Sequence, residues 1–175
     1  MAGSPTSIDA ADHLVDADSL LYQGVSDALV AQVIPAQTVK IQVMAFESNA
    51  NNNLFLTWKI FLIDSAGDVV VSGTIVDIRR DGLECSAAAA TNRSDSVTST
   101  QVTARAGDRI CIEMGIGGLP TAAAGVNDHD GALRVGDTGD DLPEDDTTTA
   151  TPTEFVPWFE LTNTLATQAV RQGIL

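Results

Sequence analysis

The fold is decided between residues 39 and 78, which read VKIQVMAFESNANNNLFLTWKIFLIDSAGDVVVSGTIVDI. The first nine residues alternate: Val39, Ile41, Val43 and Ala45 share one face, and Lys40, Gln42 and Met44 share the other. A period of two is expected of a half-buried β-strand. After the polar turn SNANNN, the run LFLTWKIFLID is almost continuously apolar, which is typical of a central strand. In this run we expect Trp58 and Ile60 on the face opposite Phe55, Thr57, Lys59 and Phe61. The turn DSAGD predicts a hairpin into VVVSGTIVDI, whose β-branched residues favour a pleated sheet.

Further strands are predicted downstream of this region. Residues 79–95 read as a loop, and residues 96–105 and 108–116 read as two strands joined by the short turn AGD. The stretch from Gly117 to Pro152 is rich in Gly, Ala, Asp and Thr, with one short strand in GALRVGD. The last strand is EFVPWFELT, where Pro157 indicates an edge or a bulge because proline cannot donate to a sheet ladder.

The pattern as a whole predicts an all-β protein, an antiparallel β-sandwich or jelly roll with an extended N-terminal arm. About seven or eight strands with polar turns and no regular alternation with helices favour this class. A length of 175 residues fits one domain. We expect an arm over residues 1–38, a sandwich over 39–163 and a tail over 164–175.

The charge of the chain restricts its partners. It carries 24 acidic against 9 basic residues, a net charge of -15. Nucleic acid and anionic membrane bind clustered Lys and Arg, so neither is expected as a direct partner. No stretch approaches the roughly 20 apolar residues of a membrane helix, and the N-terminus lacks the basic and apolar regions of a secretory signal. We therefore expect synthesis in the cytoplasm.

No reactive motif is present in the sequence. Cys85 and Cys111 lack CxxC or His-linked spacing, which leaves two alternatives, reduced thiols or one disulfide between them. The chain has no GxSxG nucleophile elbow and no GxxxxGK[ST] or GxGxxG phosphate loop. We expect no enzymatic activity and no cofactor.

The acidic segment NDHDG has the composition of a calcium loop without its full pattern. Asn127, Asp128 and Asp130 precede a glycine, but Ala132 and Arg134 occupy the next ligand positions and no Glu ends the loop. A solvated, turn-forming loop is the alternative. A second cluster in GDTGDDLPEDD could provide a carboxylate pair for glycoside hydrolysis, although exposed acids in loops have neither the burial nor the fixed separation that this reaction needs. Its members are Asp140, Asp141, Glu144, Asp145 and Asp146.

The sequence TARAGDRICIEMGIGG, followed by GALRVGDTGDDLPEDDTTTATPTEFVPWFELT, resembles β-sandwich structural proteins of tailed bacteriophages. The resemblance rests on four pieces in the same order: a Gly-Asp-Arg strand, a Leu-Arg-Val-Gly strand, an Asp-Leu-Pro-acidic turn and a terminal Pro-Trp-aromatic-Glu strand. It covers residues 39–163 and implies a head decoration or cement protein. Such a protein sits on the virion as a trimer, clamps copies of the major capsid protein and uses no cofactor.

An apolar arm suits that role, because a segment that cannot bury itself gains order on a neighbouring subunit. We expect Leu14, Val15, Leu20, Leu21 and Tyr22 to contact the capsid. Deletion of residues 1–22 is then expected to abolish assembly and leave the sandwich folded. The alternative function is a carbohydrate- or receptor-binding module of a tail fibre, in which Tyr22 or a tryptophan stacks on a ligand. Aromatic side chains embedded among Val, Ile and Leu are otherwise expected in the core.

Overall fold

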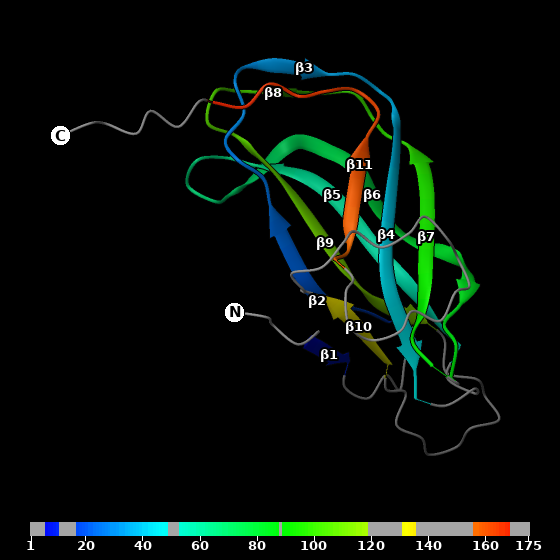
Figure 1. Ribbon diagram of the computed structural model, residues 1–175. Coiled ribbons are helices and arrows are strands. Elements are labelled where there is room, and N and C mark those ends of the chain that lie inside the picture. The colour runs from blue at the N-terminus through cyan, green and yellow to red at the C-terminus, as the bar shows by residue number, and fades with distance from the viewer. Residues whose placement is uncertain are drawn as a thin grey trace.

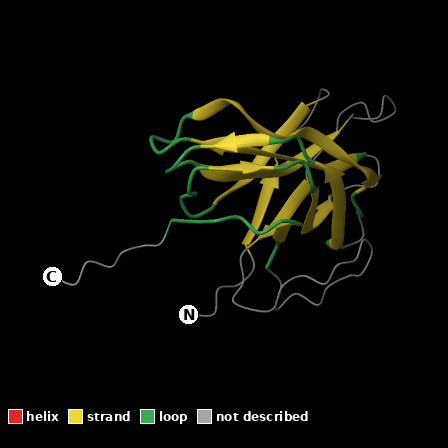
Figure 2. Cartoon of the chain, turned by 90° about the horizontal axis from the view of Figure 1, so that it is seen from above, coloured by secondary structure: helices red, strands yellow, loops and turns green. Residues whose placement is uncertain are grey.

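A computed structural model describes residues 6–10, 17–48, 53–87, 89–118, 131–135 and 156–168. Every regular element within these ranges is a β-strand, and all pairings are antiparallel (Figures 1 and 2). The predicted all-β class is confirmed. The strands are β1 (Thr6–Ala10), β2 (Ala17–Val25), β3 (Gln32–Ile34), β4 (Thr38–Glu47), β5 (Leu54–Ile63), β6 (Val69–Glu84), β7 (Thr91–Thr98), β8 (Val102–Ala104), β9 (Arg109–Gly118), β10 (Gly131–Val135) and β11 (Trp158–Leu161).

The strand order is that of a jelly roll. One sheet has the order β1-β10-β4, with β7 and β11 also on β4, and the other has the order β2-β9-β5-β6. The pairs β5–β6, β4–β7, β2–β9 and β1–β10 are nested around the turn at residues 64–68, as in a long hairpin. The contacts β4–β10 and β5–β9 roll this hairpin into two packed sheets.

The core lies between the two sheets and follows the predicted alternation. Val39, Ile41 and Val43 of β4 are fully buried, as are Trp58 and Ile60 of β5. The hairpin turn after β5 also forms as expected, with the Asp64 N–H donating to the Asp68 oxygen at 2.8 Å. Residues 131–135 and 158–161 form strands inside the two segments predicted for them.

The loop predicted over residues 79–95 is wrong at both ends. Strand β6 continues to Glu84 and β7 begins at Thr91. The segment reads as polar, but Arg79 forms an ion pair with Asp95, and Asp81 forms one with Arg93. These pairs join the edges of the two sheets, so the charged side chains are accommodated within strands. The single strand predicted over 96–105 is likewise divided between β7 and β8, which pairs with β3.

The arm predicted over residues 1–38 is wrong for the residues that the structure describes, since residues 6–10 form β1, which pairs with β10. Residues 17–25 form β2, which pairs with β9 along its length, and Leu29 and Ile34 are buried in the core. The apolar residues of β2 lack a clean period of two because this strand has a bulge between Leu20 and Tyr22. Deleting residues 1–22 would remove β1 and most of β2, so this deletion cannot be expected to leave the sandwich folded. The tail predicted over residues 164–175 is wrong for its described part, since Thr167 bridges to Leu29 and the Gln168 N–H donates to the Ala28 oxygen.

Strands β10 and β11 occupy one position beside β4. Arg134 of β10 pairs with Met44, and Trp158 of β11 pairs with Gln42, so residues 135–157 are inserted opposite Val43 in the middle of a strand position. Strand β1 lies along β10, whereas no described strand lies along the outer side of β11. The predicted edge at Pro157 is therefore consistent with the described part of the sheet, and the sandwich is open beside β11.

Candidate functional site

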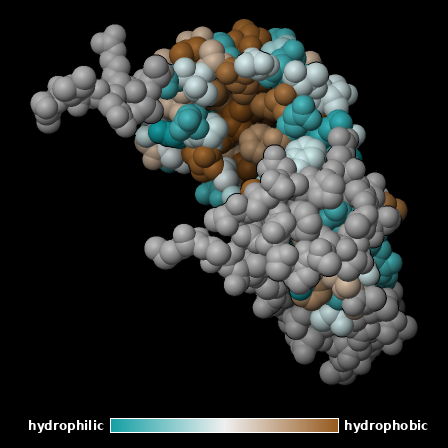
Figure 3. Space-filling view, viewed as in Figure 1, coloured by the Kyte–Doolittle hydropathy of each residue, from teal (hydrophilic) through white to brown (hydrophobic). Residues whose placement is uncertain are grey.

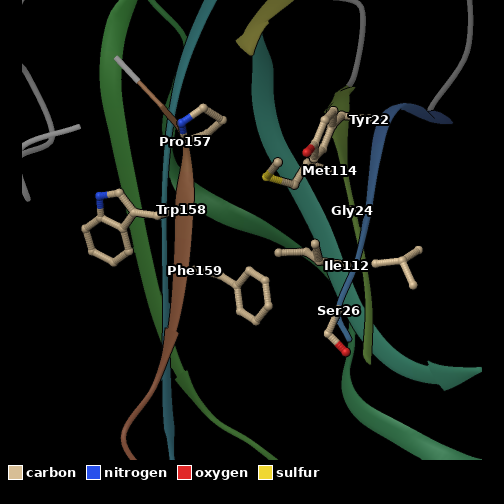
Figure 4. Close-up of a pocket in the computed structure, with 9 residues that line it drawn as sticks. Tyr22, Gly24, Ser26, Ile112, Met114, Pro157, Trp158 and Phe159 are labelled. Carbon is tan, nitrogen blue, oxygen red and sulfur yellow. The ribbon is translucent and has the colours of Figure 1, made fainter. Parts of the chain in front are cut away.

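An apolar groove lies where the sandwich is open, between β11 and the strands β2 and β9. Its volume is about 410 Å³. A hollowed, mainly hydrophobic surface is visible in the upper part of Figure 3, and Figure 4 shows the side chains of the groove. The lining residues are Tyr22, Gly24, Val25, Ser26, Ile112, Met114, Pro157, Trp158 and Phe159.

The lining is apolar because it belongs to the inner faces of both sheets. Tyr22 pairs with Met114 and Gly24 with Ile112, which places these residues side by side on β2 and β9. In Figure 4 Phe159 points from β11 toward Ile112, while Trp158 points away from the groove. Gly24 adds no side chain at its position. The groove is therefore a part of the interior that no described strand covers.

The chemistry of the groove is that of a contact surface. Apart from the phenol of Tyr22, none of the lining side chains carries a titratable group. The Ser26 hydroxyl is already engaged, because it accepts from the Ile110 N–H at 2.9 Å and donates to the Asp27 oxygen at 2.8 Å. The groove can bury apolar side chains of a partner, but it holds no acid–base pair.

The predicted contact residues are distributed around this groove. Tyr22 lines it, and Tyr22 and Leu21 pack partly against the core. Leu20 is 43% exposed at the bulge of β2, in a shallow depression that Leu21, Gln23 and Glu113 also line. Leu14 and Val15 lie outside the described residues. The sequence prediction did not include Ile112, Met114 and Phe159. Pro157 was the one signal in the sequence for this site, because a proline inside a strand indicates a sheet edge, and β11 borders the groove.

A second notable cluster is a buried group of charges at the β6–β7 end of the sandwich. Arg93 donates to Asp81 and to the backbone oxygens of Leu83 and Glu84, and the Arg93 and Asp81 side chains are almost completely buried. Burial raises the pKa of Asp81 even though Arg93 opposes that shift. Asp95 accepts hydrogen bonds from Arg79 and from the indole N–H of Trp58 at 2.8 Å. These contacts fasten the two sheets together.

Glu47 is a buried carboxyl near this cluster. Its side chain is almost inaccessible, and it accepts a hydrogen bond from the Leu54 N–H at 3.0 Å. Burial, opposed by this bond and reinforced by Glu84, raises the pKa of Glu47 to about 7. The carboxyl thus links the end of β4 to the start of β5 through the Leu54 N–H, and its burial disfavours the charged form.

Both cysteines are buried free thiols, which decides between the two alternatives in favour of the reduced form. Burial raises the pKa of Cys85 to about 12 and also raises the pKa of Cys111. A thiol with so high a pKa is protonated at neutral pH and is a poor nucleophile.

The two acidic segments weighed above, residues 127–130 and 140–146, lie outside the described residues, so the choice between a calcium or carboxylate site and a solvated loop stays open. Within the described ranges, no group of three or more His, Cys, Asp and Glu side chains could hold a metal ion. The same ranges contain no helix long and apolar enough to cross a membrane.

The strand order thus defines an eight-stranded jelly roll with an open side. No protein-family profile and no curated protein sequence matches the chain. Solved structures with a similar backbone include the VP2 subviral particle of infectious bursal disease virus, with a TM-score of 0.44, 11% identity and coverage of 77% of this chain and 30% of that chain. The Gx strain of that virus gives a TM-score of 0.44, 12% identity and coverage of 77% and 29%.

Eiger TNF from S. frugiperda is also similar, with a TM-score of 0.27, 8% identity and coverage of 81% of this chain and 99% of that chain. The chain thus spans about a third of the length of the viral proteins. At these scores the likeness is limited to a loosely similar arrangement of strands. The assignment of the jelly roll therefore rests on strand order and register.

Proposed function

We propose that this protein is a structural component of a virus particle, a cement or decoration protein on the capsid surface of a tailed phage. It is made in the host cytoplasm and binds the major capsid protein through apolar contact, without cofactor or catalysis. The observation that carries this proposal is the open apolar groove beside β11, a surface suited to another protein chain. Jelly rolls occur in viral capsid domains, which is compatible with the role but does not define it.

The position of the motifs supports the proposal. The Gly-Asp-Arg motif leads into β9, the Leu-Arg-Val-Gly motif lies on β10, and the Pro-Trp-Phe-Glu motif forms the start of β11. Two of these three strands contribute the groove residues Ile112, Met114 and Phe159. Two of the four pieces of the resemblance therefore lie on strands that line the surface we assign to partner binding.

The proposal is tested by the copy number of this protein in purified virions, measured by quantitative mass spectrometry against the major shell protein. A cement protein is present in near-stoichiometric amounts, because every equivalent position of the shell is occupied, and a trimer gives copy numbers divisible by three. A few copies per particle would place the protein in the tail. Its absence from virions would refute a structural role.

A matched pair of variants tests whether β2 contributes to the capsid contact. Leu20 and Leu83 are exposed leucines, at 43% and 50%, and lie on different strands. We expect Leu20→Ser to reduce the fraction of decorated particles and Leu83→Ser to leave it unchanged. Equal decoration by both variants would remove Leu20 from the contact.

A carbohydrate- or receptor-binding module of a tail fibre is the second candidate. The observation in its favour is the phenol of Tyr22 in the groove, since an aromatic ring with a hydroxyl can stack on a sugar and bond to it. Trp158, the other candidate for stacking, points away from the groove in Figure 4. A glycan array separates the two functions, because only the fibre module is expected to bind a defined sugar.

A further inference from the structure

The groove is bordered by the outer edge of β11, on which no strand of the described ranges pairs and whose backbone groups have a defined pattern. The Thr162 N–H donates to the Thr38 oxygen at 3.3 Å, which continues the register that pairs Glu160 with Lys40. Bonded pairs alternate in an antiparallel ladder. The N–H and C=O groups of Phe159 and Leu161 therefore point away from β4, toward the side on which no described strand pairs with β11.

This edge faces a strand position that the described strands fill only beside β10. Strand β1 occupies the position beside β10, with Thr6 opposite Val135, and the same position continues beside β11. Filling it would cover the inner faces of β2 and β9 that the groove exposes. The groove extends along β2 from Tyr22 to Ser26, or about 13 Å at roughly 3.3 Å per residue. This length suits an extended segment of about five residues.

We propose that the groove binds an extended segment of a partner protein, which adds to β11 as a strand, places large apolar side chains at alternate positions into the groove and carries Lys or Arg on its flanks. This proposal deepens the proposed function, on which its biological context rests, by specifying the chemistry of the partner. Strand addition derives affinity from main-chain hydrogen bonds and specificity from alternate side-chain pockets.

Charge favours a basic partner over the other occupants. Asp27 and Glu160, both exposed, directly follow the lining residues Ser26 and Phe159 in the chain. Residues 136–155, which lead to the start of β11, contain seven acidic residues and no Lys, Arg or His. A second copy of this chain carries a net charge of -15 and is repelled at low salt. Within this chain, residues 1–5 (MAGSP) precede β1 in sequence, but Gly and Pro disfavour strands, and Met1 is the one large apolar residue among these five.

The test uses the full chain and a nine-residue peptide in which three valines alternate with two threonines between pairs of basic residues. Residue-resolved amide hydrogen exchange is measured with and without the peptide. We expect exchange at Phe159 and Leu161 to slow at least tenfold, and affinity to fall as salt increases. A peptide of the same composition with its valines adjacent, and one with Glu flanks, are the controls and should bind at least tenfold more weakly.

Two matched comparisons make the result specific. Two N-methylated peptides are compared, each with methyl groups on alternate backbone nitrogens. Methylation of the nitrogens that face β11 should abolish binding, and methylation of the nitrogens that face away should leave binding unchanged. Phe159→Ala should weaken binding at least tenfold, whereas Phe55→Ala, on the other sheet and outside the groove lining, should not change it.

Four results would overturn the proposal. Binding that tolerates both methylated sets excludes strand addition. Protection of Phe159 and Leu161 in the free protein that disappears on deletion of residues 1–5 assigns the position to this chain's own N-terminus. Protection that increases with protein concentration assigns it to a second copy. Absence of any peptide binding excludes the stated chemistry. None of these results depends on the copy number in virions, so this inference and the proposed function fail separately.

Discussion

Replacement of Glu47 by Gln should remove a pH dependence of stability that the fold imposes. Below pH 4.5 the Glu47 carboxyl is protonated in both the folded and the unfolded chain. Between pH 4.5 and about 7 the unfolded chain releases this proton and the folded chain retains it. The folded state then binds more protons, so the free energy of unfolding falls as the pH rises through this window.

The magnitude follows from the pKa. A carboxyl pKa raised from 4.5 to about 7 corresponds to about 3 kcal/mol lost above pH 7, at roughly 1.4 kcal/mol per pH unit. The Gln variant keeps an oxygen to accept the Leu54 N–H bond and has no proton to lose. We expect it to match the wild type below pH 4.5 and to be more stable by about 3 kcal/mol at pH 8.

The assay is urea unfolding of both proteins at several pH values from 4 to 8, compared as the difference between them so that other titrating groups cancel. Glu160→Gln, at an exposed position, is the matched control, and its curve should run parallel to that of the wild type. A difference between wild type and Glu47→Gln that stays constant from pH 4 to 8 would refute the reasoning.

Three further changes test other parts of the fold. Arg93→Leu should destabilise the protein by about 3–5 kcal/mol in urea unfolding, because it leaves Asp81 buried without its partner, and adding Asp81→Leu should restore most of the loss; no recovery in the double variant would contradict this. Gly115→Ala should cost about 3 kcal/mol, since the added Cβ would lie 1.7 Å from the Ser19 oxygen, whereas Gly82→Ala, with no atom within 4 Å of its added Cβ, should change stability by less than about 0.5 kcal/mol. Cys85 and Cys111 should react with a thiol reagent only after unfolding, and rapid labelling of the native protein at neutral pH would show that either thiol is accessible.

The core strands could be predicted from the sequence because the face that each turns to the core is its more apolar one. In β4, the alternation identified the core face of Val39, Ile41, Val43 and Ala45, although Gln42 and Met44 on the other face are also buried. The turn at residues 64–68 was equally clear, because Gly67 adopts a positive φ of 94° and Asp64 accepts the N–H of Ala66 and Asp68.

The features that could not be predicted depend on partners distant in sequence. Arg79 and Asp81 read as loop residues until Asp95 and Arg93 are placed opposite them. From the sequence, Leu29 reads as part of an arm. In the structure its N–H donates to the Asp108 oxygen and its backbone bridges to Thr167. The groove itself depends on the end of β1, which is set by pairing with β10 rather than by local sequence. Tyr22 was predicted as a contact residue, whereas its neighbours across the ladder were not.

The nested pairing has a consequence for the order in which the chain can fold during synthesis. Gly24 pairs with Ile112, and Thr6 pairs with Val135, so β1 and β2 leave the ribosome well before the strands with which they pair. At about 5–20 residues per second, β2 remains without its neighbour for roughly 4–18 seconds. Only the β5–β6 hairpin can form early, and it is the expected starting point of folding. Premature termination anywhere before β9 would therefore release a chain with unpaired apolar strands, which is a substrate for aggregation or for chaperones.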